Sequence, residues 1–398
     1  MWLCEDLLNP ILDRLKNTLD YIRLPKRKRL SDCATLPKER LSDWASLPED
    51  LLNLIINRFE PCDYNRLIAV CKSWNLMASR LHKDNRIRLS NQPPWLLKRS
   101  CHGKQYLFNY AKGAPISCKL IIPDPYRRML LCGCCHGRLI FFESPQLVVL
   151  DPLSGVVIKL PPFNNRFFKY VDKVISSTDP CLGSKFEVLA TCRYSDVVAH
   201  LVFGETMWTY SERTRDYYTY NFVFYKNRIL GASKEGRILS LNVINSSSKD
   251  SSSPTRISLE EISSEILSEV LQGTPNLDTF FVANTNGELL MVARCTRGKY
   301  FIFKIIINSN GQIDLSLVVD LGGHCLFLGK HNSTSVMASN YPGYFRPNTI
   351  YYVRSQGLQN CGGFEEFNLD YQTLRADDRC FAMCEGSWFV PSLKLVTS

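Results

Sequence analysis

The sequence lacks the features that would place the chain in or across a membrane. In its 398 residues, no apolar run reaches the ~18 residues that a membrane-spanning helix needs. Its first residues carry Glu5, Asp6 and Asp13 among apolar ones, which is the composition of neither a secretory signal nor a transit peptide. We therefore expect no membrane association and a location in the nucleus, the cytoplasm or both.

Signatures of catalysis are also absent. The chain has no glycine-rich phosphate loop of the P-loop or dinucleotide type. A nucleophilic pair would have to use Cys135 or Cys325 beside His136 or His324, but neighbouring residues on a strand point in opposite directions. We predict that the chain is not an enzyme and needs no cofactor; a propeller enzyme is the alternative.

Metal-ligand spacing is missing as well. Zinc sites usually take four ligands delivered as two separated pairs. This chain instead has one tight group, Cys132, Cys134, Cys135 and His136. Farther on, Cys380 and Cys384 are separated by three residues rather than two, with no histidine pair. We predict no metal site. With no secretion signal, the 16 cysteines are expected to be buried thiols in a reducing compartment.

The charge is positive but not concentrated. A net charge of +10 favours acidic partners or nucleic acid in principle. The one dense basic cluster is a candidate nuclear localisation signal, Arg23, Lys26, Arg27, Lys28 and Arg29. Elsewhere bases are interspersed with acids, so we do not expect nucleic acid as a partner. A basic nuclear protein that contacts nucleic acid remains the alternative.

Length and pattern divide the chain into three parts. At 398 residues, a small and a large domain are expected. Residues 1–44 combine an amphipathic helix, apolar every three or four residues, with the basic linker. Residues 29–39 and 40–50 are near copies, RLSDCATLPKE and RLSDWASLPED, too short to be a repeat architecture.

Residues 45–90 have the pattern of three short helices. Pro48 suits a first helical position, Pro61 ends that helix and Asp63 can cap the next one. The apolar positions are Leu51, Leu52, Ile55, Ile56, Phe59, Leu67, Val70, Cys71, Trp74 and Met77. Three short helices cannot bury this surface among themselves, so a partner chain is expected.

From about residue 105 the periodicity becomes that of strands. Predicted strands cover residues 137–142, 147–150, 156–160, 227–230, 237–241, 279–283, 288–293 and 300–307. Turns fall at 151–155, 234–236 and 286–287. Short strands with regular turns and a loose period indicate an all-β propeller of six or seven blades; a sandwich pair is the alternative.

Two further segments of the large domain carry predictions. Residues 258–261 have capping-box form, and apolar spacing through Val270 predicts a helix inserted at the propeller rim. An aromatic group is expected in strand cores, with a rim surface as the alternative. It consists of Trp208, Tyr210, Tyr217, Tyr218 and Tyr220.

Residues 47–80, LPEDLLNLIINRFEPCDYNRLIAVCKSWNLMASR, resemble the F-box. The large domain, 105–398, resembles the KIB-type propeller that follows the F-box in a large family of plant proteins. The matching segments are 135–137, 151–155, 160–161, 287–292, 303–304, 321–329, 348–352 and 388–393. Two positions depart from that family: Arg138 replaces its usual tryptophan, and Gly323 stands where an acid is frequent.

The resemblance implies a fold and a function. The fold is α+β and multidomain, with a three-helix F-box followed by an all-β propeller. The function is that of a substrate-recognition subunit in a Skp–cullin–F-box ubiquitin ligase, with an unknown target on the propeller. An F-box regulator without ubiquitin transfer is the alternative. Contact with the Skp-type adaptor, and through it a cullin, is assigned to Leu47, Pro48, Leu51, Leu52, Ile55, Cys71 and Trp74.

Overall fold

The structure is a computed structural model that describes most of the second of two compact units. The units comprise residues 1–92 with 117–119, and residues 93–116 with 120–398. Described are Lys72, Leu76 and residues 93–99, 105–109, 114–115, 122–123, 125–126, 129–153, 155–164, 171–180, 185–192, 195–211, 219–233, 237–244, 256–262, 277–284, 286–295, 298–309, 312–354, 363–377 and 386–390. Within these residues, no helix is long and apolar enough to cross a membrane.

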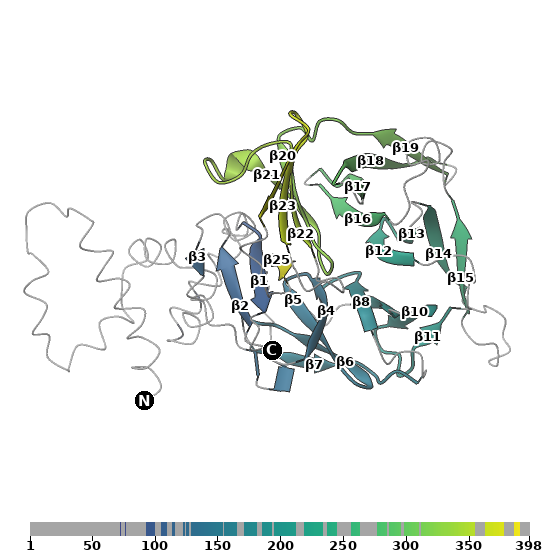
Figure 1. Ribbon diagram of the computed structural model, residues 1–398. Coiled ribbons are helices and arrows are strands. Elements are labelled where there is room, and N and C mark those ends of the chain that lie inside the picture. Colours follow the sequence, from purple (N-terminus) through teal and green to yellow (C-terminus); the bar gives the residue numbers. More distant parts are fainter. Residues whose placement is uncertain are drawn as a thin grey trace, which may run out of the picture. The chain divides into compact units, whose positions relative to one another are not determined.

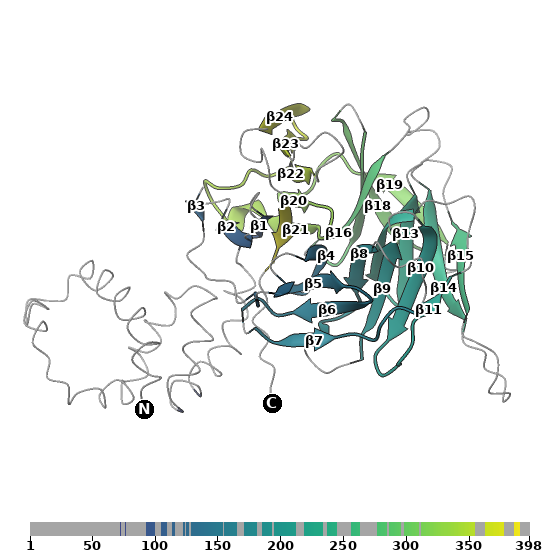
Figure 2. The same cartoon turned by 60° about the horizontal axis from the view of Figure 1, so that its bottom comes forward.

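The described strands form six separate sheets, five of four strands and one of five (Figures 1 and 2). One sheet joins β25 (Gly386–Phe389) to β1 (Trp95–Arg99), β2 (Gln105–Asn109) and β3 (Ala114–Pro115). The next contains β4 (Leu130–Cys135), β5 (Arg138–Glu143), β6 (Gln146–Leu150) and β7 (Val157–Lys159). The third contains β8 (Val171–Ser176), β9 (Glu187–Cys192), β10 (Ser195–Val202) and β11 (Thr209–Tyr210).

The remaining three sheets continue in chain order. One is built from β12 (Thr219–Tyr225), β13 (Arg228–Ser233), β14 (Ile238–Ile244) and β15 (Arg256–Glu261). Another has β16 (Asp278–Ala283), β17 (Leu289–Arg294), β18 (Tyr300–Ile307) and β19 (Ile313–Leu317). The last has β20 (His324–Leu328), β21 (Thr334–Met337), β22 (Thr349–Arg354), β23 (Gly363–Asn368) and β24 (Thr373–Asp377), with η5 (Ala338–Asn340) after β21.

Contacts between sheets arrange them in a ring. The strands that meet are β4 with β8, β8 with β12, β12 with β16, β16 with β21, β22 with β25, and β25 with β4. Apart from β22, each of these lies at one end of its sheet, so one end strand of every sheet faces the centre. This is an all-β propeller, as expected from the strand pattern. The prediction was six or seven blades, and the described part of the chain contains six sheets.

The ring closes by pairing the two ends of the propeller. Strand β25, near the C-terminus, runs antiparallel to β1, with Trp388 opposite Leu96. The Trp388 side chain is fully buried, and its indole N–H donates to the carbonyl of Leu328 at 3.0 Å. One sheet therefore depends on strands from both ends of the domain.

Most predicted strands and turns are confirmed. The three strands predicted between residues 137 and 160 correspond to β5, β6 and β7, and the predicted strand 300–307 coincides with β18. In the turn at 151–155, the Asp151 carboxylate accepts the amide of Leu153 at 2.9 Å. Gly155 takes a φ of 78° there and donates its amide to the Asp151 carbonyl at 2.8 Å. That left-handed conformation explains the glycine.

The predicted helix beginning at Ser258 is wrong over its described part. Residues 256–261 form strand β15, in which Leu259 pairs with Leu241 and Ile257 with Val243. Residues 263–276 lie outside the described part of the chain. The capping-box pattern was overridden because Ile257 and Leu259 pack on the apolar face of the neighbouring strand, a tertiary contact that local spacing does not reveal.

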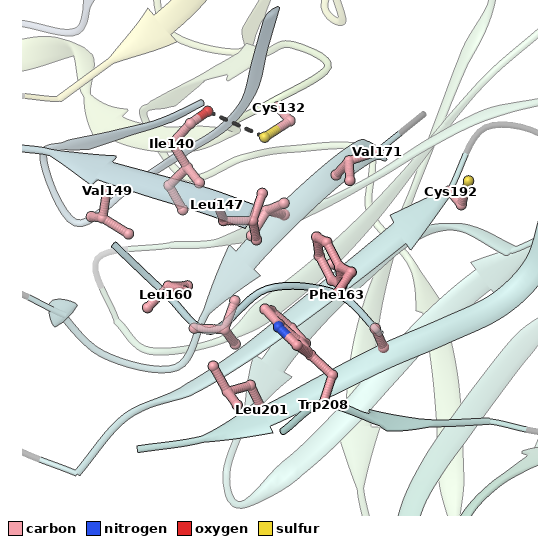
Figure 3. Close-up of a cluster of buried hydrophobic side chains, with 14 of the residues drawn as sticks. Cys132, Ile140, Leu147, Val149, Leu160, Phe163, Val171, Cys192, Leu201 and Trp208 are labelled. Atoms are coloured by element: carbon pink, nitrogen blue, oxygen red, sulfur yellow. Dashed lines mark hydrogen bonds between the residues drawn. The ribbon is translucent and has the colours of Figure 1, made fainter. Parts of the chain in front are cut away.

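Apolar side chains from neighbouring sheets pack between the blades. Figure 3 shows the cluster between the β4–β7 and β8–β11 sheets, with Phe163 and Trp208 in contact at 4.5 Å between ring centroids. The Trp208 indole N–H donates to the Pro161 carbonyl at 2.8 Å. Trp208 is therefore a core residue and not part of a rim surface. Burying an aromatic side chain of this kind contributes roughly 2–3 kcal/mol.

Candidate functional site at the centre of the propeller

Polar side chains from opposite sides of the ring meet at its centre. Lys330 lies between β20 and β21, and its ammonium group is 2.7 Å from the carboxylate of Asp172 on β8. The sheets that hold these two residues are not neighbours in the ring, because the β8–β11 sheet contacts those of β4 and β12 while the β20–β24 sheet contacts those of β16 and β25. The ion pair therefore spans the propeller centre.

A second chain of contacts links three strands that face the centre. The Lys173 ammonium on β8 donates to the side-chain oxygen of Asn221 on β12. The Asn221 amide nitrogen in turn donates to the backbone carbonyl of Thr279 on β16. We call Asp172, Lys173, Asn221, Thr279 and Lys330 the channel cluster. Its members come from four different sheets, so only the closed ring can assemble it.

The electrostatics of the channel cluster are governed by burial. Desolvation lowers the pKa of Lys173 to about 8, with Asp172 opposing the shift and Lys330 adding to it. The described cluster contains two lysines and one carboxylate, which forms an ion pair with Lys330, so the cluster carries a positive excess at neutral pH. The Thr279 hydroxyl is buried and has no hydrogen-bond partner in the described protein. Buried hydroxyls usually have a hydrogen-bond partner, either in the protein or in an ordered water molecule.

The thiols beside the channel cluster have a packing role. The Cys135 thiol lies 3.1 Å from the Ser176 hydroxyl, and burial raises the pKa of Cys135. His136 contacts the Ser176 carbonyl at 3.1 Å from a turn. Cys132 and Cys134 are fully buried in two different apolar clusters, and burial raises the pKa of each. Protonated, buried thiols of this kind are inert.

The second sequence candidate for a nucleophile is also buried. Burial raises the pKa of Cys325 to about 12, and its thiol lies 3.6 Å from the Val336 carbonyl. A ring nitrogen of His324 contacts the Leu321 carbonyl at 3.0 Å. Among the described residues, no group of three or more His, Cys, Asp or Glu side chains is placed to hold a metal ion. Cys380 and Cys384 lie outside these residues.

A buried arginine takes the place where the resembling family has tryptophan. The Arg138 guanidinium, fully buried at the start of β5, donates to the Asp179 carboxylate at 3.1 and 3.0 Å. It also lies 2.9 Å from the Asp151 carboxylate in the β6–β7 turn. No local sequence pattern predicts this group, because Asp179 is 41 positions away from Arg138.

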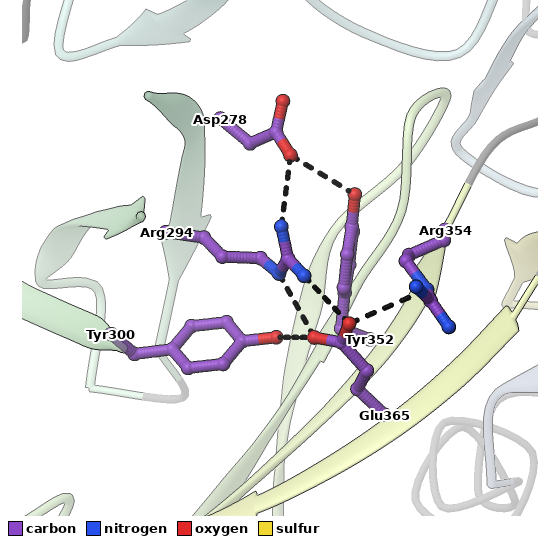
Figure 4. Close-up of polar contacts among 6 residues, drawn as sticks. All are labelled: Asp278, Arg294, Tyr300, Tyr352, Arg354 and Glu365. Atoms are coloured by element: carbon purple, nitrogen blue, oxygen red, sulfur yellow. Dashed lines mark hydrogen bonds and ion pairs between the residues drawn. The ribbon is translucent and has the colours of Figure 1, made fainter. Parts of the chain in front are cut away.

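A further polar network joins the β16–β19 and β20–β24 sheets (Figure 4). Glu365 on β23 accepts two hydrogen bonds from Arg294 on β17, at 2.9 and 2.6 Å, and one from the Tyr300 hydroxyl at 2.8 Å. Burial, with Glu365 adding to it, raises the pKa of Tyr300, so this hydroxyl keeps its proton. The Arg294 guanidinium also lies over the Tyr352 ring, 5.0 Å from its centroid. These interactions connect the two neighbouring sheets.

The predicted adaptor-binding residues lie outside the described part of the chain. They are Leu47, Pro48, Leu51, Leu52, Ile55, Cys71 and Trp74, and their role stays a prediction. The same holds for the candidate nuclear localisation signal, Arg23, Lys26, Arg27, Lys28 and Arg29. Lys72 and Leu76, which are described, are helical and exposed.

Comparison with family models defines the class of this protein. The F-box domain model matches residues 44–86 and the KIB1-4 beta-propeller model matches residues 107–368. An F-box followed by a propeller indicates a protein of the F-box substrate-receptor type, and both domains are typically non-catalytic. F-box domains generally bind Skp-type adaptors. The propeller match covers well over half of the chain, so the chain belongs to the KIB1-4 beta-propeller family.

Similar solved structures are distant. BBS1N, in a complex with ARL6DN soaked with lead, has 9% identity, a TM-score of 0.33 and covers 73% of both chains. YCF48 from Cyanidioschyzon merolae has 10% identity and a TM-score of 0.30, covering 64% of this chain and 66% of its own. The Cps50 (Swd1) beta-propeller domain of Myceliophteria thermophila has 12% identity and a TM-score of 0.31, with coverage of 71% and 79%. No curated protein matches the chain.

Proposed function

We propose that this protein is the substrate-recognition subunit of a Skp–cullin–F-box ubiquitin ligase. The observation that carries the proposal is the succession of an F-box at residues 44–86 and a KIB1-4 propeller at residues 107–368 in one chain. The F-box docks on a Skp-type adaptor, which connects the chain to a cullin. The propeller holds a target protein, and ubiquitin transfer is performed by other subunits.

The adaptor contact rests on the apolar face predicted for the F-box helices. A stable interface buries roughly 1,600 Å² in total, and a few anchor residues carry most of its energy. We assign the anchor role to Pro48 and Trp74, with Leu47, Leu51, Leu52, Ile55 and Cys71 around them. The sequence predicts a helix start at Pro48, and Trp74 has a large aromatic side chain of a type that is common among interface anchors.

The propeller contributes rigidity and proximity. We propose that each of the six described sheets is one blade, with β25 closing the ring. Loops on such a rigid ring are the usual place for recognition. A bound target is then held beside the charged conjugating enzyme at an effective concentration in about the millimolar range. Catalysis by this chain is not required.

Affinity capture from cells with the proteasome and cullin activity blocked tests the proposal. The intact chain is compared with a Pro48→Ala, Trp74→Ala variant and with a matched control, Met207→Ala, which changes an exposed propeller residue. We expect the double variant to lose Skp and cullin while it retains propeller-bound proteins. The control keeps both. Equal recovery of the adaptor by all three chains would contradict the docking assignment. Normal adaptor binding without ubiquitination of any captured protein would favour a regulator instead.

A further inference from the structure

An ion pair crosses the centre of the propeller. The Lys330–Asp172 pair spans the ring at 2.7 Å, and its side chains are 25% and 18% exposed. They are therefore within reach of solvent. The pair therefore leaves charged groups at the centre accessible to a small solute.

The second lysine of the channel cluster is what makes the site unusual. The hydrogen-bond acceptor of Lys173 is the neutral side chain of Asn221, while the nearby carboxylate of Asp172 pairs with Lys330. A buried charge is costly unless an opposite charge lies beside it. Two ammonium groups with one carboxylate among the described residues of the cluster therefore favour an additional negative charge.

A second observation concerns Thr279, which the Asn221 side chain links to Lys173. This residue is buried, its carbonyl accepts the hydrogen bond from Asn221, and its hydroxyl has no protein partner within the described residues. Ammonium groups supply several charge-assisted donors and a hydroxyl supplies one more. Donors of this kind suit an oxygen-rich anion better than a cation or an apolar molecule.

We propose that the channel cluster binds a small tetrahedral oxyanion of the phosphate class, held between Lys173 and Lys330. The anion supplies a second negative charge that balances the two ammonium groups. Repulsion by the Asp172 carboxylate limits the affinity of the site for the anion. A small free solute is favoured over a phosphorylated protein side chain because the Lys330 and Asp172 side chains are only 25% and 18% exposed. The proposal does not depend on the ligase function.

Titration calorimetry of the full chain with inorganic phosphate at pH 7 tests this site. We expect binding that weakens at least about tenfold in Lys173→Gln and in Lys330→Gln, as for the loss of one charge-assisted contact. The matched control is Lys159→Gln, a half-exposed lysine on β7 paired with Glu143, which leaves binding unchanged. No heat at millimolar phosphate, or equal losses in the control, overturns the proposal.

Two further variants separate binding from a merely structural role. Asp172→Asn removes the competing carboxylate, so we expect tighter phosphate binding; a structural ion pair alone predicts no gain. Sulfate, which does not titrate in this range, should bind less well as pH rises past 8, because Lys173 loses its proton beside Asp172, Lys330 and Cys135. Lys173→Arg should remove that pH dependence. Three results would overturn the assignment. The first is weaker phosphate binding by Asp172→Asn, and the second is a pH profile of sulfate binding in Lys173→Arg that is parallel to that of the native chain. The third is a phosphoserine peptide that binds more tightly than phosphate through the same lysines.

Discussion

Removing the carboxylate of Glu365 is expected to destabilise the propeller strongly. This side chain is 3% exposed. It accepts hydrogen bonds from Arg294 and Tyr300, and it forms an ion pair with Arg354 at 3.4 Å. In Glu365→Ala, the Arg294 guanidinium, 12% exposed, keeps Asp278, at 3.5 Å, as its only ion-pair partner among the described residues. Asp278 is 54% exposed, so that pair contributes little. Leaving a buried charge without its partner costs about 3–5 kcal/mol.

A companion variant separates the charge from its burial. Arg294→Met combined with Glu365→Met removes both charges and leaves apolar side chains of similar length. Replacing a buried ion pair in this way is often nearly neutral, so we expect the double variant to lose less than Glu365→Ala alone. The Tyr300 hydroxyl still loses its acceptor, at a cost of about 1–3 kcal/mol, which adding Tyr300→Phe should recover.

Urea unfolding of the full chain, followed by tryptophan fluorescence, measures these differences. Trp95, Trp208 and Trp388 are all buried in the propeller and report its unfolding. The matched control is Glu366→Ala, the next residue on β23, whose ion pair with the exposed Arg346 is 3.7 Å long and should contribute less than about 1 kcal/mol. A loss below 1 kcal/mol for Glu365→Ala, or a double variant as unstable as the sum of its single changes, would refute the reasoning.

Two other predictions concern ring closure and pH. Trp388→Ala removes a fully buried side chain from the strand that closes the ring, and it should lower the free energy of unfolding, measured in urea, by about 3–5 kcal/mol. A urea midpoint equal to that of the native chain would show that β25 does not hold the ring together. The folded pKa of Lys173, about 8, lies below the ordinary value of 10.5, so the unfolded chain binds more protons between these pH values. In anion-free buffer, the stability of the native chain relative to Lys173→Met should therefore rise by about 3 kcal/mol from pH 8 to 10.5, and parallel pH profiles would contradict this.

The amino-acid sequence alone determined the class of the fold and most of its strands. Short apolar runs bounded by turn residues mark β5, β6 and β18 as buried strands, and this information is local. The Asp151 turn was equally predictable, because a short acid and a glycine have specific backbone conformations. The F-box, too, is recognised from a short contiguous run of residues.

The tertiary structure decided what lies next to what. Lys330 and Asp172 are 158 positions apart, and Arg294 and Glu365 are 71 apart, so neither pair leaves a local pattern. Residues 258–261 have capping-box form and still belong to β15, because they pair with β14. The local pattern of apolar residues specifies which parts of each strand are buried. The neighbours of each strand in the ring are set instead by contacts between segments that are far apart in the sequence. The charged centre of this propeller therefore exists only once the ring has closed.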